Sequence, residues 1–182
     1  MRKKTDAMTL RRRSALRQML LICALFLSVT GAVMAQDGSP RAEVKANFGG
    51  ATFIVDDGGG HHLVSGAVRV YVTKRFSIEP EFVYMRDGAA DQDRLFSVNA
   101  AYDITDPGQR AVFYAIAGGG VQSHRRNPPF DNGYTRGSWN AGIGVKVFIT
   151  KRLFVAPELR IGVEPIARAT IGIGYVFAKW KE

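Results

Sequence analysis

Apolar and polar residues alternate along most of the chain after its first 39 residues. From 64 to 72 the even positions are valine or glycine, and Arg69 is among the odd positions. From 76 to 84 the even positions are all apolar, whereas the odd positions include Glu79 and Glu81. A period of two residues places neighbouring side chains on opposite faces of a strand. The pattern therefore predicts β-strands with one apolar face and one polar face.

Eight segments of the chain show this alternation, and helical periodicity is almost absent beyond the first 39 residues. Clusters of Gly, Asp, Asn and Pro separate the segments, as they commonly do between strands. The predicted strands are 44–54, 64–72, 76–84, 94–104, 110–121, 142–149, 153–161 and 167–177. The sequence thus predicts an all-β fold with an even number of strands.

The connections between these strands alternate in length. The short ones are 73–75, 105–109 and 150–152, and the others are 56–62, 86–93, 122–136 and the brief 162–165. Each strand has about ten residues, which is the length that a tilted strand needs to cross a bilayer. Short turns at one end and longer loops at the other are typical of an up-and-down transmembrane β-barrel. We therefore predict an eight-stranded antiparallel barrel of this type.

Two segments of the chain are nearly the same. "VRVYVTKRFSIEPEFVY" runs from Val68 to Tyr84, and "VKVFITKRLFVAPELRI" runs from Val145 to Ile161. Val, Thr, Lys, Arg, Pro and Glu recur at matching places without a gap. In the predicted barrel each copy supplies a strand, a short turn and a returning strand, and the two copies lie on opposite sides.

The alternation of apolar and polar residues is compatible with a barrel in water and with a barrel in a membrane. A soluble lipocalin-like barrel turns its apolar set inward, whereas a membrane barrel turns that set to lipid and fills its lumen with the polar set. Aromatic residues near the strand ends favour lipid, because they form a girdle at the membrane interface. This predicted girdle comprises Phe76, Tyr84, Phe96, Tyr102, Tyr114, Tyr175 and Phe177. The opposite face holds small residues suited to a crowded interior, namely Ala115, Ala117, Gly142, Gly144, Gly172 and Gly174.

Charged residues of both signs fall on the predicted lumen face. They are Arg69, Glu79, Glu81, Lys146, Glu158 and Arg160. Isolated charges in a narrow lumen would be costly, so we expect ion pairs between strands. The alternative is a regulated solute pore lined by the same residues, but a barrel of eight strands is only just wide enough for its own side chains.

The first 35 residues have the organisation of a secretory signal peptide. A basic stretch precedes a short apolar run from Met19 to Ala35, and we place cleavage after Ala35. A retained membrane anchor is the alternative, and Met8 is an alternative start. The single cysteine, Cys23, lies within the apolar run and follows Ile22, which does not suit lipid attachment. The predicted organisation is a signal peptide at 1–35 and one barrel domain at 36–182.

Removing the signal peptide changes the charge of the chain. Residues 1–35 carry seven basic residues and one acidic residue, which is +6 of the total formal charge of +9. The mature chain is therefore only +3, and we expect no nucleic-acid partner. Without cysteines the mature chain also has no disulfides, and we expect a monomer.

Several of these segments resemble the small outer-membrane β-barrel family, which is porin-like or OmpA/OmpX-like. They are "VYVTKRFSIEPEF", "VFITKRLFVAPELR", "YAIAGGGV" from Tyr114 to Val121 and the aromatic last strand, and the resemblance covers essentially the whole mature chain. It implies a Gram-negative outer membrane and insertion by the barrel-assembly machinery, with Tyr175 and Phe177 in the recognised strand. Family members usually stop at the terminal aromatic, but here "AKWKE" follows Phe177. Either the tail is tolerated or Trp180 takes that role.

The predicted loops contain all three histidines. His61 and His62 lie near Asp56 and Asp57, which makes a metal site conceivable, although a metal needs three or four ligands in fixed geometry. A solvated surface loop is the simpler interpretation, and we expect no metal or other cofactor.

Catalysis is a second possibility for these loops, because Ser123 adjoins His124 and Asp131 follows. Neighbouring strand residues point to opposite faces, so Ser123 and His124 are poorly placed as nucleophile and base. We therefore expect no enzymatic activity, and an outer-leaflet lipid-modifying enzyme remains the alternative.

The loop at 122–136 is the best candidate for recognition. It combines Arg125, Arg126 and Arg136 with Phe130 and Tyr134. Guanidinium groups bind phosphates in a bidentate manner, so contact with lipopolysaccharide or another ligand is a hypothesis. A solvated basic loop without a ligand is the alternative. The predicted function is that of an integral outer-membrane barrel with a structural or surface-interaction role, a plugged lumen and ligand-accessible loops.

Overall fold

The computed structural model describes residues 39–53, 60–87, 91–126, 133–163 and 166–180. The predicted signal peptide at 1–35 lies outside the described residues. Eight strands account for nearly all of the described part of the chain. They are β1 (Pro40–Phe53), β2 (Gly60–Tyr71), β3 (Phe76–Asp87), β4 (Asp91–Asp103), β5 (Ala111–Arg126), β6 (Tyr134–Phe148), β7 (Leu153–Gly162) and β8 (Ile166–Lys179).

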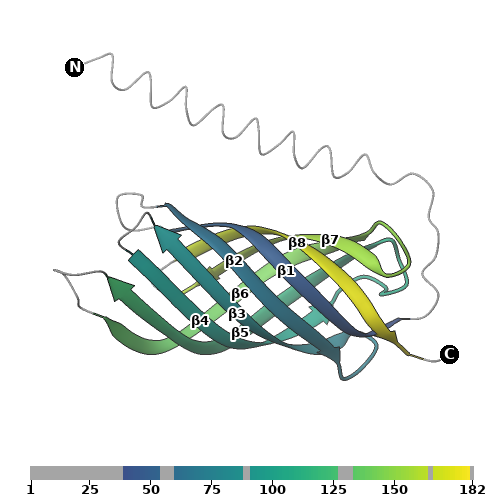
Figure 1. Ribbon diagram of the computed structural model, residues 1–182. Helices are drawn as coiled ribbons and strands as arrows, with labels where there is room; N and C mark the ends of the chain where they lie inside the picture. The colour runs from purple at the N-terminus through teal and green to yellow at the C-terminus, as the bar shows by residue number, and fades with distance from the viewer. Residues whose placement is uncertain (1–38, 54–59, 88–90, 127–132, 164–165, 181–182) are drawn as a thin grey trace, which may run out of the picture. The chain divides into compact units, whose positions relative to one another are not determined.

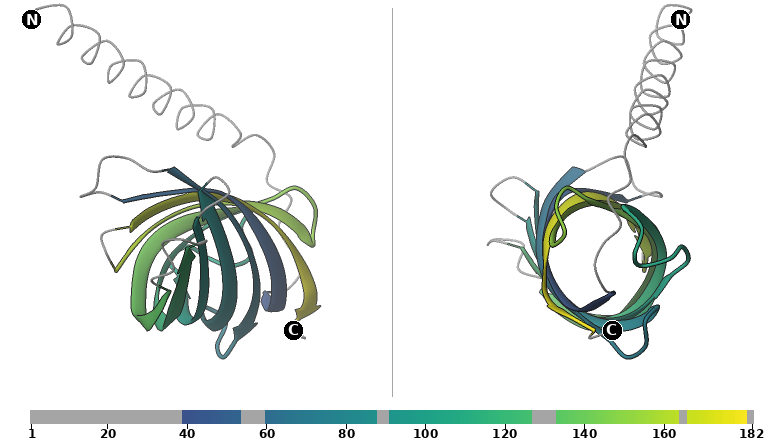
Figure 2. Two further views of the ribbon diagram at one scale, coloured as in Figure 1. Left: turned by 60° about the vertical axis from the view of Figure 1, so that its left-hand side comes forward. Right: turned by 90° about the vertical axis from the view of Figure 1, so that its right-hand side faces the viewer.

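The strands form one closed antiparallel barrel in sequence order (Figure 1). Each strand pairs with the next, and β1 pairs with β8 from Pro40↔Lys179 to Phe53↔Ile166. Viewed along its axis, the barrel is a complete ring (Figure 2, right). The predicted eight-stranded antiparallel barrel is confirmed. Its short-turn end contains the β2–β3, β4–β5 and β6–β7 turns, and the opposite end is called the loop end below.

Several strands continue beyond the predicted ends at the loop end of the barrel. β5 runs to Arg126 and β6 begins at Tyr134, so the predicted loop at 122–136 is wrong over most of its length. His61 and His124 likewise lie in strands, and not in loops. Antiparallel pairing needs only backbone groups, so it can continue past the point where the outward side chains cease to be apolar. The apolar alternation therefore marked only the middle part of each strand.

The repeated sequence forms the same turn twice. The hydroxyl of Thr73 accepts hydrogen bonds from the backbone N–H groups of Arg75 and Phe76, at 3.3 and 2.9 Å. In the second copy Thr150 accepts from Arg152 and Leu153 at the same two distances. A threonine side chain that bonds its own turn fixes the path of a short connection. The shared "TKR" therefore encodes a common way of reversing the chain.

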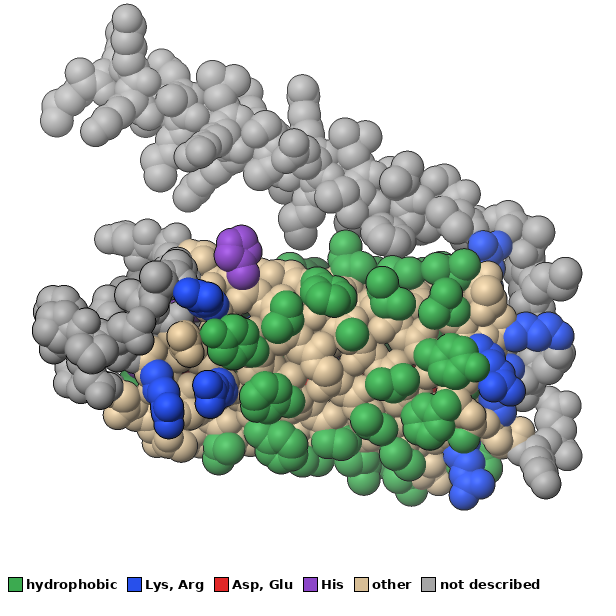
Figure 3. Space-filling model, in the orientation of Figure 1, with side chains coloured by type: hydrophobic (Ala, Val, Ile, Leu, Met, Phe, Trp, Pro, Cys, Tyr) green, Lys and Arg blue, Asp and Glu red, His purple; other side chains and the backbone are tan. Residues whose placement is uncertain are grey.

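Apolar side chains face outward and polar side chains face the lumen, as predicted for a barrel surrounded by lipid. Large apolar residues on the outer face remain exposed, including Val68, Val70, Ile78, Phe82, Phe96, Tyr102, Ile143, Leu159, Ile171, Tyr175 and Phe177. They cover the middle of the barrel, and Lys and Arg side chains lie towards both ends (Figure 3). A soluble carrier with its apolar set inside is therefore wrong, because that set faces outward.

The faces of β5 are the reverse of those predicted. Tyr114, expected in the outer girdle, points inward and is only 1% exposed, whereas Ala117, expected inside, is exposed. Gly144, which is opposite Tyr114 on β6, explains the difference. A Cβ atom on Gly144 would lie 2.5 Å from the Tyr114 ring, so the glycine leaves the space that the ring fills. An aromatic side chain over a cross-strand glycine is a known way to fill such a gap.

Among the described residues, three apolar clusters lie inside the barrel: one near each end and a smaller one of Ala101, Tyr114 and Ile116. Val112, Phe148, Phe154, Ala156 and Val176 form the cluster near the short-turn end. Ala51, Leu63, Val83, Met85 and Leu95 form the cluster towards the loop end. Between these two end clusters the inward side chains are mostly polar or charged and are buried. The middle of the lumen is therefore the part of the protein where charged groups are concentrated.

Gly120 allows β5 to approach β4 closely. A Cβ atom there would lie 1.9 Å from the carbonyl oxygen of Phe96 and 2.6 Å from the Cα atom of Ser97. These are backbone atoms in a ladder that continues on both sides, so they cannot move aside. Gly66 on β2 differs, because a Cβ atom there would meet nothing within 4 Å.

We predict that Gly120→Ala lowers the free energy of unfolding by about 2 kcal/mol or more, because the methyl group must push two strands apart. Gly66→Ala is the matched control and is expected to change it by less than about 0.5 kcal/mol. The measurement is the temperature at which unboiled protein in detergent loses the electrophoretic mobility of the folded barrel. Equal midpoints for the two variants would contradict the assigned close approach.

Candidate functional site

The candidate site is the charged network in the middle of the lumen, and Arg160 is at its centre. Arg160 donates through Nε to Glu158 Oε1 at 2.7 Å and through Nη1 to Glu81 Oε2 at 2.9 Å. Its Nη2 donates to Glu79 Oε1 at 3.1 Å. Glu79 and Glu81 come from β3 and Glu158 comes from β7. One buried guanidinium therefore connects two strands that lie about 80 residues apart in the sequence.

Three further cations complete the network. Lys45 donates to Glu158 at 3.0 Å and lies 3.4 Å from Glu79. Arg69 Nε donates to Glu79 Oε2 at 2.6 Å. Lys146 Nζ lies 3.2 Å from Glu43 and 3.0 Å from Asp103, and it also contacts the hydroxyl of Tyr71. The structure thus brings all six charged residues predicted for the lumen into one connected set.

Sequence reasoning missed five members of this network: Glu43, Lys45, Tyr71, Asp103 and Tyr114. Tyr114 donates to Glu158 at 2.6 Å, and the guanidinium of Arg69 lies 4.4 Å from the centre of its ring. The sequence of β1 contained a signal for two of them, because apolar residues at 44 and 48 alternate with Glu43 and Lys45. The structure agrees, since Val44 and Phe48 are exposed and Glu43 and Lys45 are buried. The same alternation along β4 would have identified Asp103.

An uncharged polar layer lies next to this network. Asn47 donates to Ser65 at 2.7 Å, and Ser65 donates to Glu81 at 2.8 Å. Asn140 donates to Asn99 at 2.9 Å and accepts from Arg160 at 3.1 Å. Burying a charge is less costly where its remaining hydrogen-bonding groups are satisfied, and this layer supplies partners to Glu81 and Arg160. Both Nη atoms of Arg69 and Oδ1 of Asp103 have no hydrogen-bond partner among the described residues.

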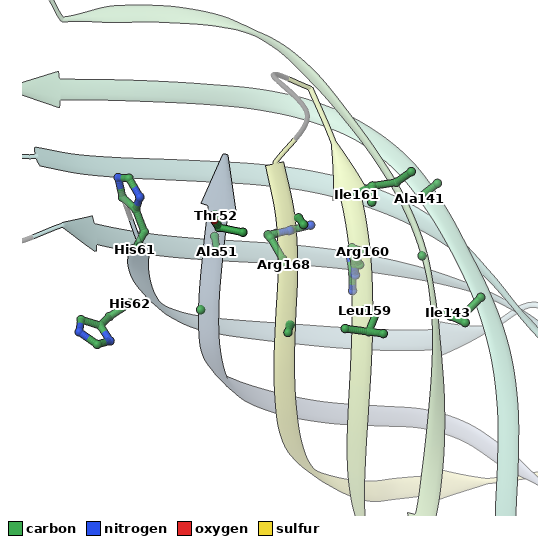
Figure 4. A pocket seen from close by; sticks show the side chains of 15 residues that line it. Ala51, Thr52, His61, His62, Ala141, Ile143, Leu159, Arg160, Ile161 and Arg168 are labelled. Atoms are coloured by element: carbon green, nitrogen blue, oxygen red, sulfur yellow. The ribbon is translucent and has the colours of Figure 1, made fainter. Parts of the chain in front are cut away.

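A second polar group lies at the loop end of the lumen, around Asp93. His124 Nδ1 lies 3.0 Å from one carboxylate oxygen of Asp93, and His61 Nε2 lies 3.8 Å from the other. Gln122 also donates to Asp93, at 3.4 Å. His62 is exposed, and Figure 4 shows it and His61 projecting from β2 in different directions. The predicted pair of histidines is therefore divided between the two faces.

The metal and catalytic hypotheses find no geometry in the described part of the chain. Among the described residues, no group of three or more His, Cys, Asp or Glu side chains is arranged to hold a metal ion. Asp56, Asp57 and Asp131 lie outside the described residues. Ser123 accepts a hydrogen bond from Thr135 at 3.4 Å, while the neighbouring His124 turns to Asp93 and stacks on Tyr134. Ser123 and His124 thus point to opposite faces, as the alternation predicted.

The residues predicted for ligand contact also differ in where their side chains lie. Arg125 is exposed, whereas Arg136 is half-buried and its guanidinium lies 5.0 Å from the ring centre of Tyr134. The side chain of Arg126 is not described, and Phe130 lies outside the described residues. Of the three arginines, Arg125 alone is shown on the outer surface.

A depression of about 860 Å³ is bounded by β1, β2, β6, β7 and β8 (Figure 4). Small residues such as Gly50, Ala141, Ala167 and Ala169 line it, together with the exposed Leu159 and its apolar neighbours Ile143 and Ile161. Two arginines that also line it, Arg160 and Arg168, are buried. The surface it presents is therefore mainly apolar, which suits contact with lipid chains.

Comparison with known proteins supports the barrel fold described above. The chain matches the family model "Outer membrane protein beta-barrel domain" over residues 21–164. Comparison with curated proteins gives no match. No described helix is long and apolar enough to cross a membrane.

Three solved structures are similar to the barrel. Neisserial surface protein A has a TM-score of 0.62 at 11% identity, over 75% of this chain and 96% of that one. The N-terminal barrel domain of Pseudomonas aeruginosa OprF has a TM-score of 0.58 at 20% identity, over 76% and 98%. The attachment invasion locus protein Ail of Yersinia pestis has a TM-score of 0.53 at 10% identity, over 76% and 98%. These similarities show the fold, and the family match shows that this chain belongs to the outer-membrane β-barrel family.

Proposed function

We propose that this protein is a non-enzymatic outer-membrane barrel whose lumen is closed by its own side chains and whose outer rim contacts anionic lipid. The observation that carries the closed lumen is the set of three ion pairs from Arg160 to Glu79, Glu81 and Glu158. The pairs with Glu79 and Glu81 join β7 to β3, which are not neighbours in the barrel, and the pair with Glu158 lies within β7. A cation held by carboxylates from separate strands occupies the space through which an ion would pass.

Two further features support a closed lumen. An eight-stranded barrel encloses an interior only just wide enough for side chains. Between the charged network and the short turns, the cluster containing Phe148 and Phe154 fills the lumen with apolar side chains. The ring centres of these two phenylalanines are 5.3 Å apart. An ion that entered from the loop end would therefore meet both a charged and an apolar barrier.

The geometry around His124 supports a non-enzymatic role. Its Nδ1 is hydrogen-bonded to Asp93, and the adjacent hydroxyl of Ser123 lies on the other face of β5. An activated nucleophile needs a base within hydrogen-bond reach. Within the described ranges, the printed hydrogen-bond partner of Ser123 is the hydroxyl of Thr135, which is not a base.

Wild-type protein is expected to give no single-channel conductance in planar bilayers, because Arg160 and its partners close the lumen. Arg160→Ala combined with Phe148→Ala and Phe154→Ala is expected to conduct and to favour cations, because the charged and the apolar barriers are then both removed and three carboxylates face an emptied space. Arg160→Ala alone is expected to stay closed, because the apolar cluster remains. This single variant is also expected to lose about 3–5 kcal/mol of stability, since a buried ion pair has lost one partner. Lys74→Gln, in the exposed β2–β3 turn, is the control and should behave as wild type. Steady conductance by the wild type would instead favour the solute pore.

A specific observation favours lipid contact at the outer rim. Arg86 and Arg125 both face Gln92, from β3 and β5 respectively, and Arg94 is the next outward residue along β4. All three arginine side chains are exposed. Towards the middle of the barrel, the next outward residues are Tyr84 on β3 and Phe96 on β4, and Phe96 is opposite Phe82 in the β3–β4 ladder. We call Arg86, Arg94 and Arg125 the rim arginines.

The position of the rim arginines suits phosphate groups at the membrane surface. Figure 3 shows Lys and Arg side chains at the loop end, directly beside the belt of hydrophobic side chains. Neighbouring strand backbones lie about 4.8 Å apart, so the Cα atoms of Arg86 and Arg125 are separated by about 10 Å across β4. Guanidinium groups bind phosphate oxygens in pairs, and lipopolysaccharide displays phosphates at this depth of the outer leaflet. The rim arginines therefore replace Arg126 and Arg136 in the proposed contact.

Changing all three rim arginines to glutamine is expected to reduce the affinity for lipopolysaccharide vesicles at least about tenfold, because each basic residue near an anionic surface contributes about 1 kcal/mol. The matched control carries Lys74→Gln, Arg110→Gln and Lys151→Gln at the short-turn end, which removes the same charge. The measurement is co-sedimentation of the refolded protein with vesicles that contain intact or dephosphorylated lipid A. Equal loss in both triple variants would show a general charge effect and would contradict a rim site.

Insertion by the barrel-assembly machinery belongs to the same proposal. β8 carries Tyr175 and Phe177 on its exposed outer face, and it is the strand that closes the ring against β1. The tail continues the pairing, because Trp180 N–H donates to the carbonyl of Ser39 at 3.0 Å. These contacts support a role for the last strand as the assembly signal, with the short tail tolerated.

A further inference from the structure

Arg168 on β8 is a buried cation outside the network described above. Its Cα atom is paired with that of Arg160 on β7, so two arginines lie directly opposite each other on neighbouring strands. Both are buried, at 7% and 4% exposure, and Figure 4 shows them side by side. Like charges opposite each other in a ladder destabilise a sheet unless something compensates them.

The compensation differs for the two arginines. Arg160 is bonded to three carboxylates, as described above. Arg168 forms no side-chain hydrogen bond or salt bridge with any residue that the structure describes, and its buried Nη2 atom has no partner. A buried charge without a partner costs several kcal/mol. Among the described residues, Arg168 is therefore a buried cation without a direct ion pair, and Glu81 and Glu158 act on it only at longer range.

The nearby carboxylates are held by other groups. Glu81 and Glu158 are bonded to Arg160, and Asp93 is bonded to Gln122 and His124. None of these carboxylates forms a salt bridge with Arg168. The central network contains five carboxylates and four cations, but this excess negative charge is not in contact with Arg168. Among the described residues, Arg168 therefore has no direct ion pair, and its Nη2 atom is left for a ligand to bind.

A small cavity lies beside Arg168. Its volume is about 20 Å³, and Gln122, Ser138 and Asn140 line it together with Arg168. These polar residues include side-chain N–H and O–H groups, which are the donors that an anion requires. Met85 and Leu95 form an apolar part of the wall. A cavity of this size has room for one water molecule or one ion of similar size, and not for phosphate or sulfate.

We infer that the loop end of the lumen contains a binding site for one monatomic anion of the halide class, held by Arg168 with Gln122, Ser138 and Asn140. Chloride is the occupant that common salt would supply. A water molecule could accept a hydrogen bond from Nη2, but it would leave the charge of the guanidinium uncompensated. The anion also relieves the repulsion between Arg168 and Arg160 across the β7–β8 ladder.

The test uses the full chain, refolded in detergent at one ionic strength in sodium chloride, bromide, sulfate or gluconate. An anion bound only by the folded state raises the unfolding temperature. We expect chloride and bromide to raise the midpoint of the wild type by about 3 °C relative to gluconate and sulfate, which corresponds to about 1 kcal/mol. Arg168→Gln is expected to abolish this difference. Lys74→Gln, which removes an exposed cation at the β2–β3 turn, should retain it.

A direct measurement on the wild type covers the case in which Arg168→Gln does not refold. Crystals of protein refolded in bromide should show an anomalous peak in the cavity between Arg168 and Gln122. Absence of that peak would overturn the inference, and the cavity would then hold water. A halide effect on stability that persists in Arg168→Gln would overturn it too, because it would reflect a general salt effect.

Discussion

Backbone hydrogen bonding is the constraint on which the rest of this structure depends. Lipid supplies no partner for an N–H or C=O group, so a chain that crosses it with strands must pair all of them within itself. Here β1 pairs with β2 on one side and with β8 on the other, which closes the ring. Closure with eight strands also fixes a narrow interior. Every inward side chain therefore meets side chains from strands that are distant in the sequence.

The charged lumen follows from that narrow interior. Lys45 reaches Glu158, 113 residues away, and Lys146 reaches Glu43, 103 residues away. Such pairs are costly to desolvate, and their value depends on how completely the surrounding polar groups are satisfied. Asn99 and Asn140 form part of that surrounding layer. The same side chains that pair the buried charges and fill the interior also occupy the path of any solute, so closure of the lumen and stability of the barrel have one physical origin.

The two faces of the strands divide the roles of the protein. Inward residues hold the strands together. Arg168, which has no direct ion pair among the described residues, is proposed to bind an anion small enough to fit between side chains. Outward residues instead meet an environment that changes with depth, from apolar chains at Phe82 to a charged surface at Arg86. Arg168 and Arg86 thus meet different surroundings, because the side chain of Arg168 is buried inside the ring and that of Arg86 is exposed outside it.

The sequence by itself determined the strands, their order and most of their faces, because a period of two is a local property of each strand. It also identified six of the lumen charges, since each follows an apolar neighbour. Tertiary structure decided the faces of β5, where both sets are largely apolar and only the glycine at 144 shows which side Tyr114 occupies. It also decided the partners of Lys45, Asp103 and Arg168, because partners across a lumen are set by the stagger of a closed ring, which no single strand encodes.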